Sequence, residues 1–232
     1  MRAIDIRQPD EGEWESVAGD AAELQDAMAL CEGCSDLVIA HMAPNRPEIY
    51  GTPEIPFDVN VKGAANLFHA AARHGLRRVV LISSTGVVGG QVEEGLFLSR
   101  DLPGRPNSLY GLTKLLQESI AEYFHRQTGI GVAVLRPAHI CDEDTLTDKY
   151  GKRLTATNWV MIDRRDIAEA VRLSLLAPSL DYEVFYVLGH PDSETRADVK
   201  YTRNFLGWIP RHTFDIYSHD GSLKRKCDPR ST

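Results

Sequence analysis

Short apolar runs alternate with amphipathic segments along most of this chain. Apolar runs occur at 36–40, 78–83, 132–135 and 184–188, and between them apolar residues recur at helical spacing in 21–31, 56–74, 108–128 and 163–176. Apolar strands separated by helices are typical of parallel strands that crossover helices bury on both faces. The pattern therefore predicts an α/β fold with a doubly wound parallel sheet.

The length of the chain favours one domain. Its 232 residues suffice for one well-buried core. We expect a single domain over residues 1–217 and a polar tail over 218–232. Residues 141–158 are polar and aperiodic and interrupt the alternation, so they are the expected substrate-facing insertion.

Composition and charge narrow the class of protein. The chain is 43% hydrophobic and 25% charged, which is typical of a soluble globular protein. No apolar run approaches the roughly 18 residues that span a membrane. The residues Met1–Asp5 carry charges where a secretory signal needs apolar residues, so we expect a cytoplasmic location. A net charge of −7 argues against nucleic-acid binding.

The cysteines do not predict a metal site. Cys31 and Cys34 have a zinc-like spacing, but no second Cys/His pair at matching spacing follows them. Cys141 and Cys227 are isolated. We expect no bound metal.

The strongest chemical signal lies at the start of the predicted helix 108–128. Tyr110 and Lys114 are four residues apart, a spacing that puts both on one helix face, about 5–6 Å apart at Cβ. A neighbouring cation favours the phenolate and lowers the pKa of a tyrosine from about 10. Such a tyrosine can act as a general acid or base. Alone, the same pattern also fits a packing residue.

Hydroxyl groups follow the predicted strand 78–83. Ser83, Ser84 and Thr85 come at its carboxyl end, where ligands bind in doubly wound sheets. These hydroxyls can bond a substrate oxygen, or they can bond their own turn as Ser and Thr commonly do.

Together with several other segments, these residues resemble the extended short-chain dehydrogenase/reductases, also called the NAD-dependent epimerase/dehydratase family. The resemblance covers nearly the whole chain and implies a Rossmann-like fold. Its segments, in chain order, are Gly19–Asp20, Leu37–Ala43, Asn60–Leu67, Ser83–Thr85, Tyr110 with Lys114, Leu135–Pro137, Asp166–Ala170 and Leu206–Pro210.

The resemblance implies catalytic roles. Tyr110 is the expected acid/base, and Lys114 lowers its pKa and holds the nicotinamide ribose. Either Ser84 or Thr85 orients the reacting oxygen of the substrate. Asn60 completes the catalytic tetrad that is usual in the family.

The resemblance also implies cofactor contacts. Asp20, Met42 and Ala43 would line the adenine-to-ribose side of NAD, and His139 would lie against the nicotinamide. Asp5 follows a short strand-like segment; a carboxylate there binds the ribose hydroxyls and repels a 2′-phosphate, which favours NAD over NADP.

One departure from the family pattern concerns the amino-terminal end. The family opens with a strand and a GxxGxxG loop whose helix holds the pyrophosphate. Here Gly12 and Gly19 stand alone in acidic surroundings. We expect a sheet truncated at this end, either because the start was assigned too late or because the chain has lost normal cofactor binding.

Within the family the chain most resembles uronate dehydrogenases, although Thr85–Gly86 replaces an expected Asn–His. This implies an NAD-dependent oxidoreductase acting on the CH–OH group of a sugar or sugar acid, with Arg153 binding the substrate carboxylate. A nucleotide-sugar epimerase or dehydratase, and a non-catalytic binding protein, are the alternatives. We expect a homodimer formed through the helices 56–74 and 108–128.

Overall fold

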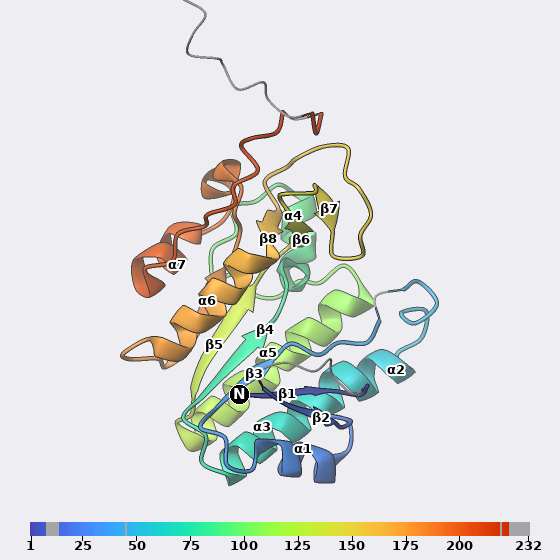
Figure 1. Ribbon diagram of the computed structural model, residues 1–232, viewed down its shortest axis with the longest axis vertical. Coiled ribbons are helices and arrows are strands. Elements are labelled where there is room, and N and C mark those ends of the chain that lie inside the picture. The colour runs from blue at the N-terminus through green and yellow to red at the C-terminus, as the bar shows by residue number, and fades with distance from the viewer. Residues whose placement is uncertain (8–13, 45, 219, 223–232) are drawn as a thin grey trace, which may run out of the picture.

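The structure, a computed structural model, describes residues 1–7, 14–44, 46–218 and 220–222. Its main sheet has four parallel strands in the order β3-β4-β5-β9 (Figure 1). The strands follow the predicted apolar runs closely, and the predicted α/β fold with a parallel sheet is confirmed. Their bounds are β3 (Asp36–Ile39), β4 (Arg78–Ile82), β5 (Gly131–Arg136) and β9 (Tyr182–Tyr186).

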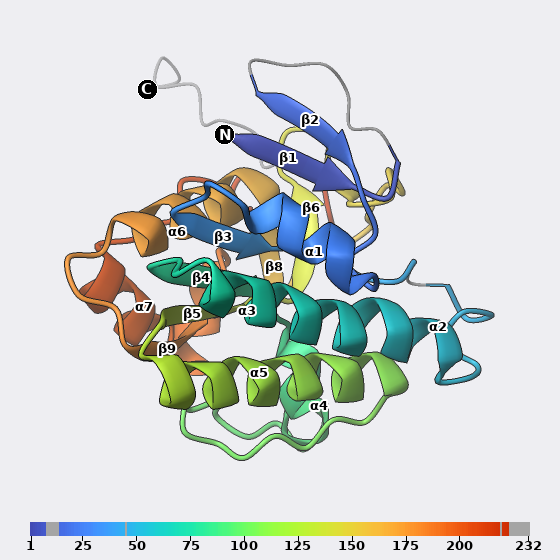
Figure 2. The same ribbon diagram turned by 90° about the horizontal axis from the view of Figure 1, so that it is seen from below.

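Helices cover both faces of this sheet (Figure 2). Within β4, Val79 and Leu81 pack into the core beneath one group of helices, whereas Val80 packs into the core on the opposite side. All three are fully buried, as expected for a parallel sheet between two helical layers. The first layer holds α1 (Leu24–Cys31), α3 (Gly63–Arg73) and α5 (Leu109–Thr128); the second holds α6 (Arg164–Leu176) and α7 (Val199–Leu206).

Two parallel strands at the amino-terminal end form a sheet separate from the main one. β1 (Arg2–Asp5) and β2 (Glu15–Ala18) pair only with each other and lie beyond β3 (Figure 2). Among the described residues, no strand is hydrogen-bonded to the outer edge of β3. Val38 of β3 is 40% exposed, although its partner on β4, Val80, is fully buried. The sheet is therefore open on the outer side of β3.

Local signals explain the bounds of α5. The Ser108 side chain caps its first turn by accepting a hydrogen bond from the backbone N–H of Gly111 at 3.1 Å. Gly129 ends it in the left-handed conformation, with φ of 72°. These two signals hold the long helix in the range that the sequence predicts.

The predicted helix 56–74 is interrupted near its start. It begins as α2 (Glu54–Pro56), continues as the π-helical turn η1 (Phe57–Lys62), and becomes α3 only at Gly63. A π turn widens the helix, and such turns often occur at functional sites. Asn60 lies within it and is fully buried. The 3.6-residue apolar spacing could not distinguish this turn from a regular helix.

A small third sheet forms beyond the carboxyl end of β5. It contains β6 (His139–Asp142), β7 (Thr147–Asp148) and β8 (Met161–Asp163), in the order β7-β6-β8. The predicted insertion 141–158 begins within β6, contains β7 and ends before β8, and its role facing the substrate stays a prediction. The remaining short elements are η2 (Thr85–Val88), α4 (Gly89–Glu93) and η3 (Pro191–Thr195).

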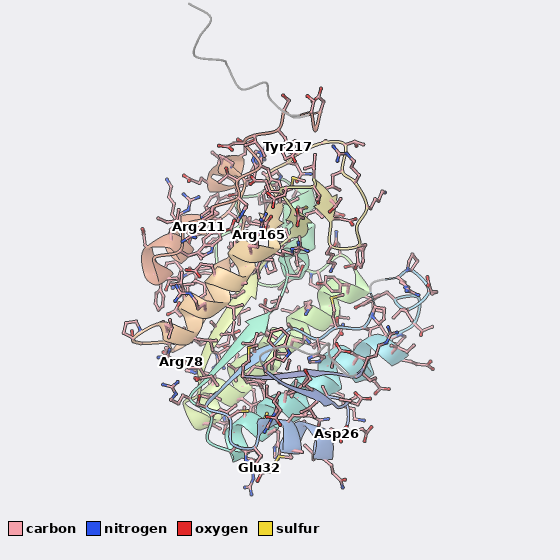
Figure 3. All side chains as sticks on the ribbon, in the orientation of Figure 1. Asp26, Glu32, Arg78, Arg165, Arg211 and Tyr217 are labelled. Carbon is pink, nitrogen blue, oxygen red and sulfur yellow. The ribbon has the colours of Figure 1, made fainter. Side chains whose placement is uncertain are left out.

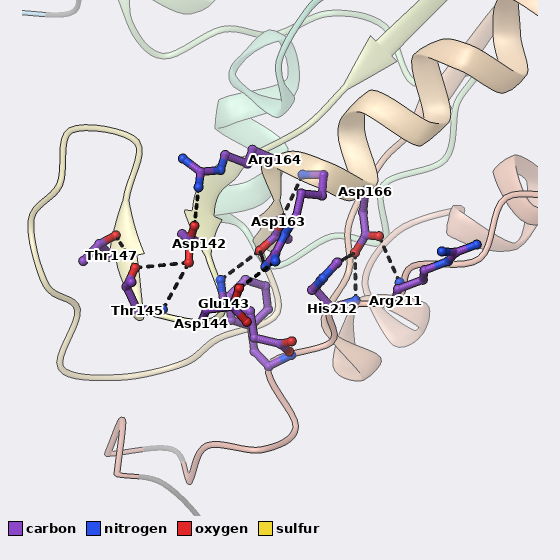
Figure 4. Close-up of polar contacts among 12 residues, drawn as sticks. Asp142, Glu143, Asp144, Thr145, Thr147, Asp163, Arg164, Asp166, Arg211 and His212 are labelled. Carbon is purple, nitrogen blue, oxygen red and sulfur yellow. Dashed lines mark hydrogen bonds and ion pairs between the residues drawn. The ribbon is translucent and has the colours of Figure 1, made fainter.

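A buried carboxylate at the start of α6 fastens the carboxyl-terminal segment. Asp166 accepts hydrogen bonds from the backbone N–H groups of Arg211 and His212 at 3.0 and 2.9 Å (Figure 4). Arg211 and Tyr217 lie toward the end of the molecule opposite Asp26 (Figure 3). Most of the predicted polar tail, 218–232, lies outside the described residues.

The described residues contain neither a membrane-spanning helix nor a cluster of metal-ligating side chains. None of the helices there is long and apolar enough to cross a membrane. No group of three or more His, Cys, Asp or Glu side chains in the same residues could hold a metal ion. Cys31 is buried, and burial raises the pKa of its thiol to about 11.

Candidate active site

Two of the predicted catalytic residues meet where β4 ends and α5 begins. The Tyr110 hydroxyl and the Ser84 side chain share a hydrogen bond. Ser84 is 8% exposed, and its Oγ also accepts from the N–H of Gly86 at 3.1 Å. Thr85, the other candidate, is held through its backbone N–H, which donates to the carbonyl of Pro137 at 3.0 Å. Of the two hydroxyls, the Ser84 hydroxyl is therefore the one in contact with Tyr110.

A close approach of two backbones makes this contact available. A Cβ placed on Gly111 would lie 2.4 Å from the carbonyl oxygen of Gly86, which is closer than real Cβ atoms come. The first turn of α5 thus packs directly on the turn after Ser84, and only glycine fits at position 111. The side chain next to it, Tyr110, is brought against Ser84 as a result.

Replacing Gly111 with alanine is expected to lower kcat by about 10²-fold, because the added methyl group pushes Tyr110 away from Ser84. Steady-state measurement of kcat would show the loss. Gly51→Ala is the matched control, since a Cβ there meets only ordinary contacts at 3.6 Å. Equal kcat values for the two variants would contradict this role of Gly111.

Lys114 lies one turn after Tyr110 and is 2% exposed. Its Nζ donates to the carbonyl oxygen of Ile82 at 2.8 Å. Burial, together with the charge of Lys149 and against that of Glu118, lowers the pKa of Lys114 to about 8.

The predicted lowering of the Tyr110 pKa is wrong for this structure. Burial raises the pKa of Tyr110 to about 12, and the hydrogen bond with Ser84 offsets only part of that effect. Burial of the phenol is the main cause, and the Lys114 amine donates its hydrogen bond to the carbonyl of Ile82. The spacing of the two residues predicts a shared helix face but not where the amine points.

Asn60 connects the π turn to the rest of this site. Its Oδ1 accepts from the backbone N–H of Ala43 at 2.7 Å, and its Nδ2 donates to Oγ1 of Thr113 at 2.9 Å. The predicted cofactor loop after β3 is thereby joined to α5, beside Tyr110 and Lys114.

Tyr50 belongs to the same group and was not anticipated from the sequence. Its ring meets that of Tyr110 edge to face, with 5.7 Å between centroids. Its hydroxyl donates to the carbonyl of Ala43 at 3.3 Å and accepts from Nδ2 of Asn60 at 3.2 Å. A tyrosine in a loop between predicted elements carries no spacing signal, so only the fold brings it to the site.

The carboxylates predicted for the adenine side bond to their own turns. Asp5 accepts from the backbone N–H of Arg7 at 3.0 Å, and Asp20 from that of Ala22 at 2.8 Å. Met42 follows β3, and its sulfur lies 3.9 Å from Nζ of Lys149. Lys149, on the segment after β7, thus reaches the predicted cofactor loop.

The other two predicted residues lie in or beside the sheet β7-β6-β8, where Arg153 forms an isolated bridge with Thr147. His139 is half-buried at the start of β6, and its backbone N–H donates to the carbonyl of Val160 at 2.9 Å. Arg153 is exposed, and its guanidinium donates to the carbonyl of Thr145 at 3.1 Å. In the described part of the chain, neither is hydrogen-bonded to Tyr110, and their predicted contacts stay predictions.

The sequence also matches a known protein family. The model of the NAD dependent epimerase/dehydratase family matches residues 6–172. The chain belongs to this family. Family membership makes the chain a member of a class of enzymes.

Individual family members show the same relationship. The chain is 27% identical to a uronate dehydrogenase of Pseudomonas syringae pv. tomato over 226 residues, covering 94% of the chain and 74% of the relative. It is 23% identical to an N-acetyl-alpha-D-glucosaminyl-diphospho-ditrans,octacis-undecaprenol 4-epimerase of Escherichia coli O157:H7, covering 84% of the chain and 67% of the relative.

Solved structures give the same fold. A mutated uronate dehydrogenase superimposes with a TM-score of 0.72 at 26% identity, covering 93% of this chain and 74% of the other. A short-chain dehydrogenase/reductase superfamily protein from Agrobacterium tumefaciens, with bound NAD, reaches 0.77 at 22% identity, covering 92% and 86%. The second likeness is at the level of fold alone.

Proposed function

We propose that this family member is an NAD-dependent oxidoreductase that oxidises a CH–OH group of a sugar or sugar acid, with uronates as its first candidate substrates. The observation that carries the proposal is the hydrogen bond between Tyr110 and Ser84, with the buried amine of Lys114 one helical turn away. A uronate dehydrogenase among the relatives and another among the similar structures support the substrate class.

The chain has groups that fit the nicotinamide-ribose end of NAD. Lys114 is a buried cation whose hydrogen-bond partner in the described residues is a single carbonyl, so its remaining N–H donors suit ribose hydroxyls. The loop with Met42 and Ala43 is held against α5 by Asn60. When bound, NAD would supply the acceptor for the hydride that leaves the substrate carbon.

The chain's residues fit the pyrophosphate end of NAD less well. The helix that follows β2, α1, starts beside Glu23 and Asp26, and its N-cap residue makes no side-chain cap. Acidic side chains repel phosphate at a helix N-terminus, where backbone N–H groups otherwise favour it. The described residues therefore offer a site for the ribose end but no comparable cradle for the pyrophosphate.

The chain's own residues handle the proton of the reaction. Tyr110 accepts the proton of the substrate hydroxyl as the C–H bond breaks, and Ser84 holds the reacting oxygen beside it. Because burial raises the pKa of Tyr110 to about 12, the phenol is protonated at neutral pH, so it must first release its own proton to solvent before the phenolate accepts the proton of the substrate. The positive charge of Lys114, whose pKa is about 8, is present below that pH and favours the phenolate during transfer.

A carboxylate on the substrate would bind to a cationic side chain near the candidate site. Arg153 is the residue that the family resemblance implies, and a guanidinium suits bidentate binding. Lys149 is a second candidate, because its charge acts on Lys114 and its amine lies next to Met42. Substrate binding by Arg153 stays part of the proposal.

The test is NADH formation by the purified chain, followed by absorbance with NAD and glucuronate or galacturonate. The proposal expects turnover with a uronate and less with the matching neutral sugar. Calorimetry with NAD alone separates the other outcomes. NAD binding without net NADH formation would support a nucleotide-sugar epimerase or dehydratase, and no NAD binding would support a non-catalytic protein.

Two further expectations belong to this proposal. The homodimer formed through residues 56–74 and 108–128 stays a prediction; within one chain these segments already pack together, with Phe68 and Phe124 stacked at 5.9 Å between centroids. The cytoplasmic location also stays a prediction.

A further inference from the structure

A buried ion pair joins α5 to the main sheet beneath the candidate site. Arg136, the last residue of β5, donates from Nε to Oε1 of Glu118 at 3.0 Å and from Nη2 to Oε2 at 2.7 Å. The two side chains are 5% and 6% exposed. A two-point contact between a guanidinium and a carboxylate fixes both direction and distance, so it holds the helix and the strand in one relative position.

Two hydroxyl groups extend this pair into a network. Ser83, directly after β4, donates its hydroxyl to Oε1 of Glu118. On the other side, Nη1 of Arg136 donates to the hydroxyl of Tyr186 on β9 at 3.1 Å. The network thus connects α5 with the ends of three neighbouring strands, all of them buried.

Three members of the network, Ser83, Arg136 and Glu118, lie next to parts of the candidate site. Ser83 precedes Ser84, and Arg136 precedes Pro137, whose carbonyl holds the backbone of Thr85. Glu118 lies one turn after Lys114. Replacing a buried ion pair with apolar residues is often neutral or stabilising, so stability alone does not explain one here.

We propose that Glu118 and Arg136 are positioning residues, whose ion pair fixes the end of β4 against α5 and so sets the contact between Ser84 and Tyr110. This role rests on the proposed function, because it serves the proton transfer assigned there. It adds two residues that the family motifs did not single out as a pair.

The charge of Glu118 has a second effect on the site. Burial and Lys149 lower the pKa of Lys114, whereas Glu118 raises it. His41 also faces Lys114, since the lysine charge lowers the pKa of that imidazole. Among these groups, Glu118 is the one whose charge keeps the lysine protonated, so removing it lowers the pKa of Lys114 below about 8.

The first experiment is a titration of Lys114 that needs neither cofactor nor substrate. In protein labelled with ¹³C-lysine, the Cε signal of Lys114, identified by its loss in Lys114→Arg, is followed against pH. Glu118→Gln is expected to lower the midpoint by about half a pH unit or more. Glu122→Gln, on the next turn and paired with the exposed Arg126, is the matched control and should leave it unchanged.

The second experiment keeps the test valid where the single variant fails to fold. The double variant Glu118→Gln with Arg136→Met removes both charges, so neither partner of this ion pair is left behind as an unpaired buried charge. We expect kcat to fall by about 10–100-fold and KM to change by less than about 3-fold, because the pair acts on geometry rather than on substrate binding. Amide exchange at Thr85 should speed up in the same variant, since its bond to Pro137 loosens.

The outcomes separate the two proposals. An unchanged Lys114 midpoint with unchanged exchange at Thr85 overturns the positioning role, and so does a double variant with wild-type kcat. If the wild-type chain oxidises no uronate, the proposed function fails. The lysine titration and the exchange rate still decide the role of Glu118 and Arg136 in that case.

Discussion

Replacing Tyr110 with phenylalanine is expected to lower kcat for uronate oxidation by about 10²–10⁴-fold, the range that general acid–base groups contribute. The substitution removes one hydroxyl and leaves the ring, so the edge-to-face contact with Tyr50 and the fold should persist. Without the phenol, no side chain bonded to Ser84 remains to take the substrate proton. Initial rates of NADH formation, with circular dichroism as a check of folding, would measure the effect.

Tyr123→Phe provides the matched control for this experiment. Tyr123 lies on the same helix but is 59% exposed, and nothing places it in the site. Its loss of a hydroxyl should leave kcat unchanged. A Tyr110→Phe variant that keeps kcat within about 3-fold of the wild type would exclude Tyr110 as the acid/base.

The second large effect is expected at Asp163, the residue that caps α6. Its side chain is fully buried and accepts four hydrogen bonds of 2.8 Å, one from the backbone N–H of Glu143 and three from Arg165 (Figure 4). Asp163→Ala removes the cap and leaves buried donors unpaired, so we expect the free energy of unfolding to fall by about 3 kcal/mol. Urea denaturation would measure it.

The same carboxylate predicts an acid dependence of stability. Burial raises the pKa of Asp163, but the hydrogen bonds from Arg165 and Glu143 outweigh burial and bring the pKa to about 2, below the ordinary aspartate value of 3.8. A depressed pKa stabilises the folded state above the unfolded-state value. This contribution of about 2.5 kcal/mol should be lost as the pH falls from about 4 toward 2.

Two variants test the assignment of both effects to Asp163. In Asp163→Asn the side chain keeps its shape but no longer titrates, so its stability should change less between pH 4 and 2 than that of the wild type. Asp144→Ala removes an exposed partner of Arg165 and should cost less than about 1 kcal/mol. A larger loss in Asp144→Ala than in Asp163→Ala would contradict the central place of Asp163.

The sequence predicts the main sheet and the long helices well, for a physical reason. Fully buried parallel strands need uninterrupted apolar residues, and β4 and β5 have them; α5 carries both a serine cap and a terminal glycine. The contact of Tyr110 with Ser84 follows from the parallel topology, which brings the end of β4 to the start of α5. These parts of the fold depend on local signals that a sequence displays.

Other parts depend on contacts that a sequence does not display. The π turn around Asn60 has the apolar spacing of an ordinary helix. The short strands of the sheet β7-β6-β8 lack an alternating pattern. The raised pKa of Tyr110 depends on burial and on the direction of the Lys114 amine. Glu118 and Arg136 are 18 residues apart, and only the packing of α5 on β5 pairs them.

The separation of β1 and β2 from the four-stranded sheet has a consequence for how this molecule could be altered. Tyr110, Ser84, Lys114 and Asn60 all lie on elements attached to the four-stranded sheet, and none is on β1 or β2. Among the described residues, the groups proposed for proton transfer therefore make no hydrogen bond to β1 or β2. A substitution confined to the two-stranded sheet is expected to leave the Tyr110–Ser84 contact in place.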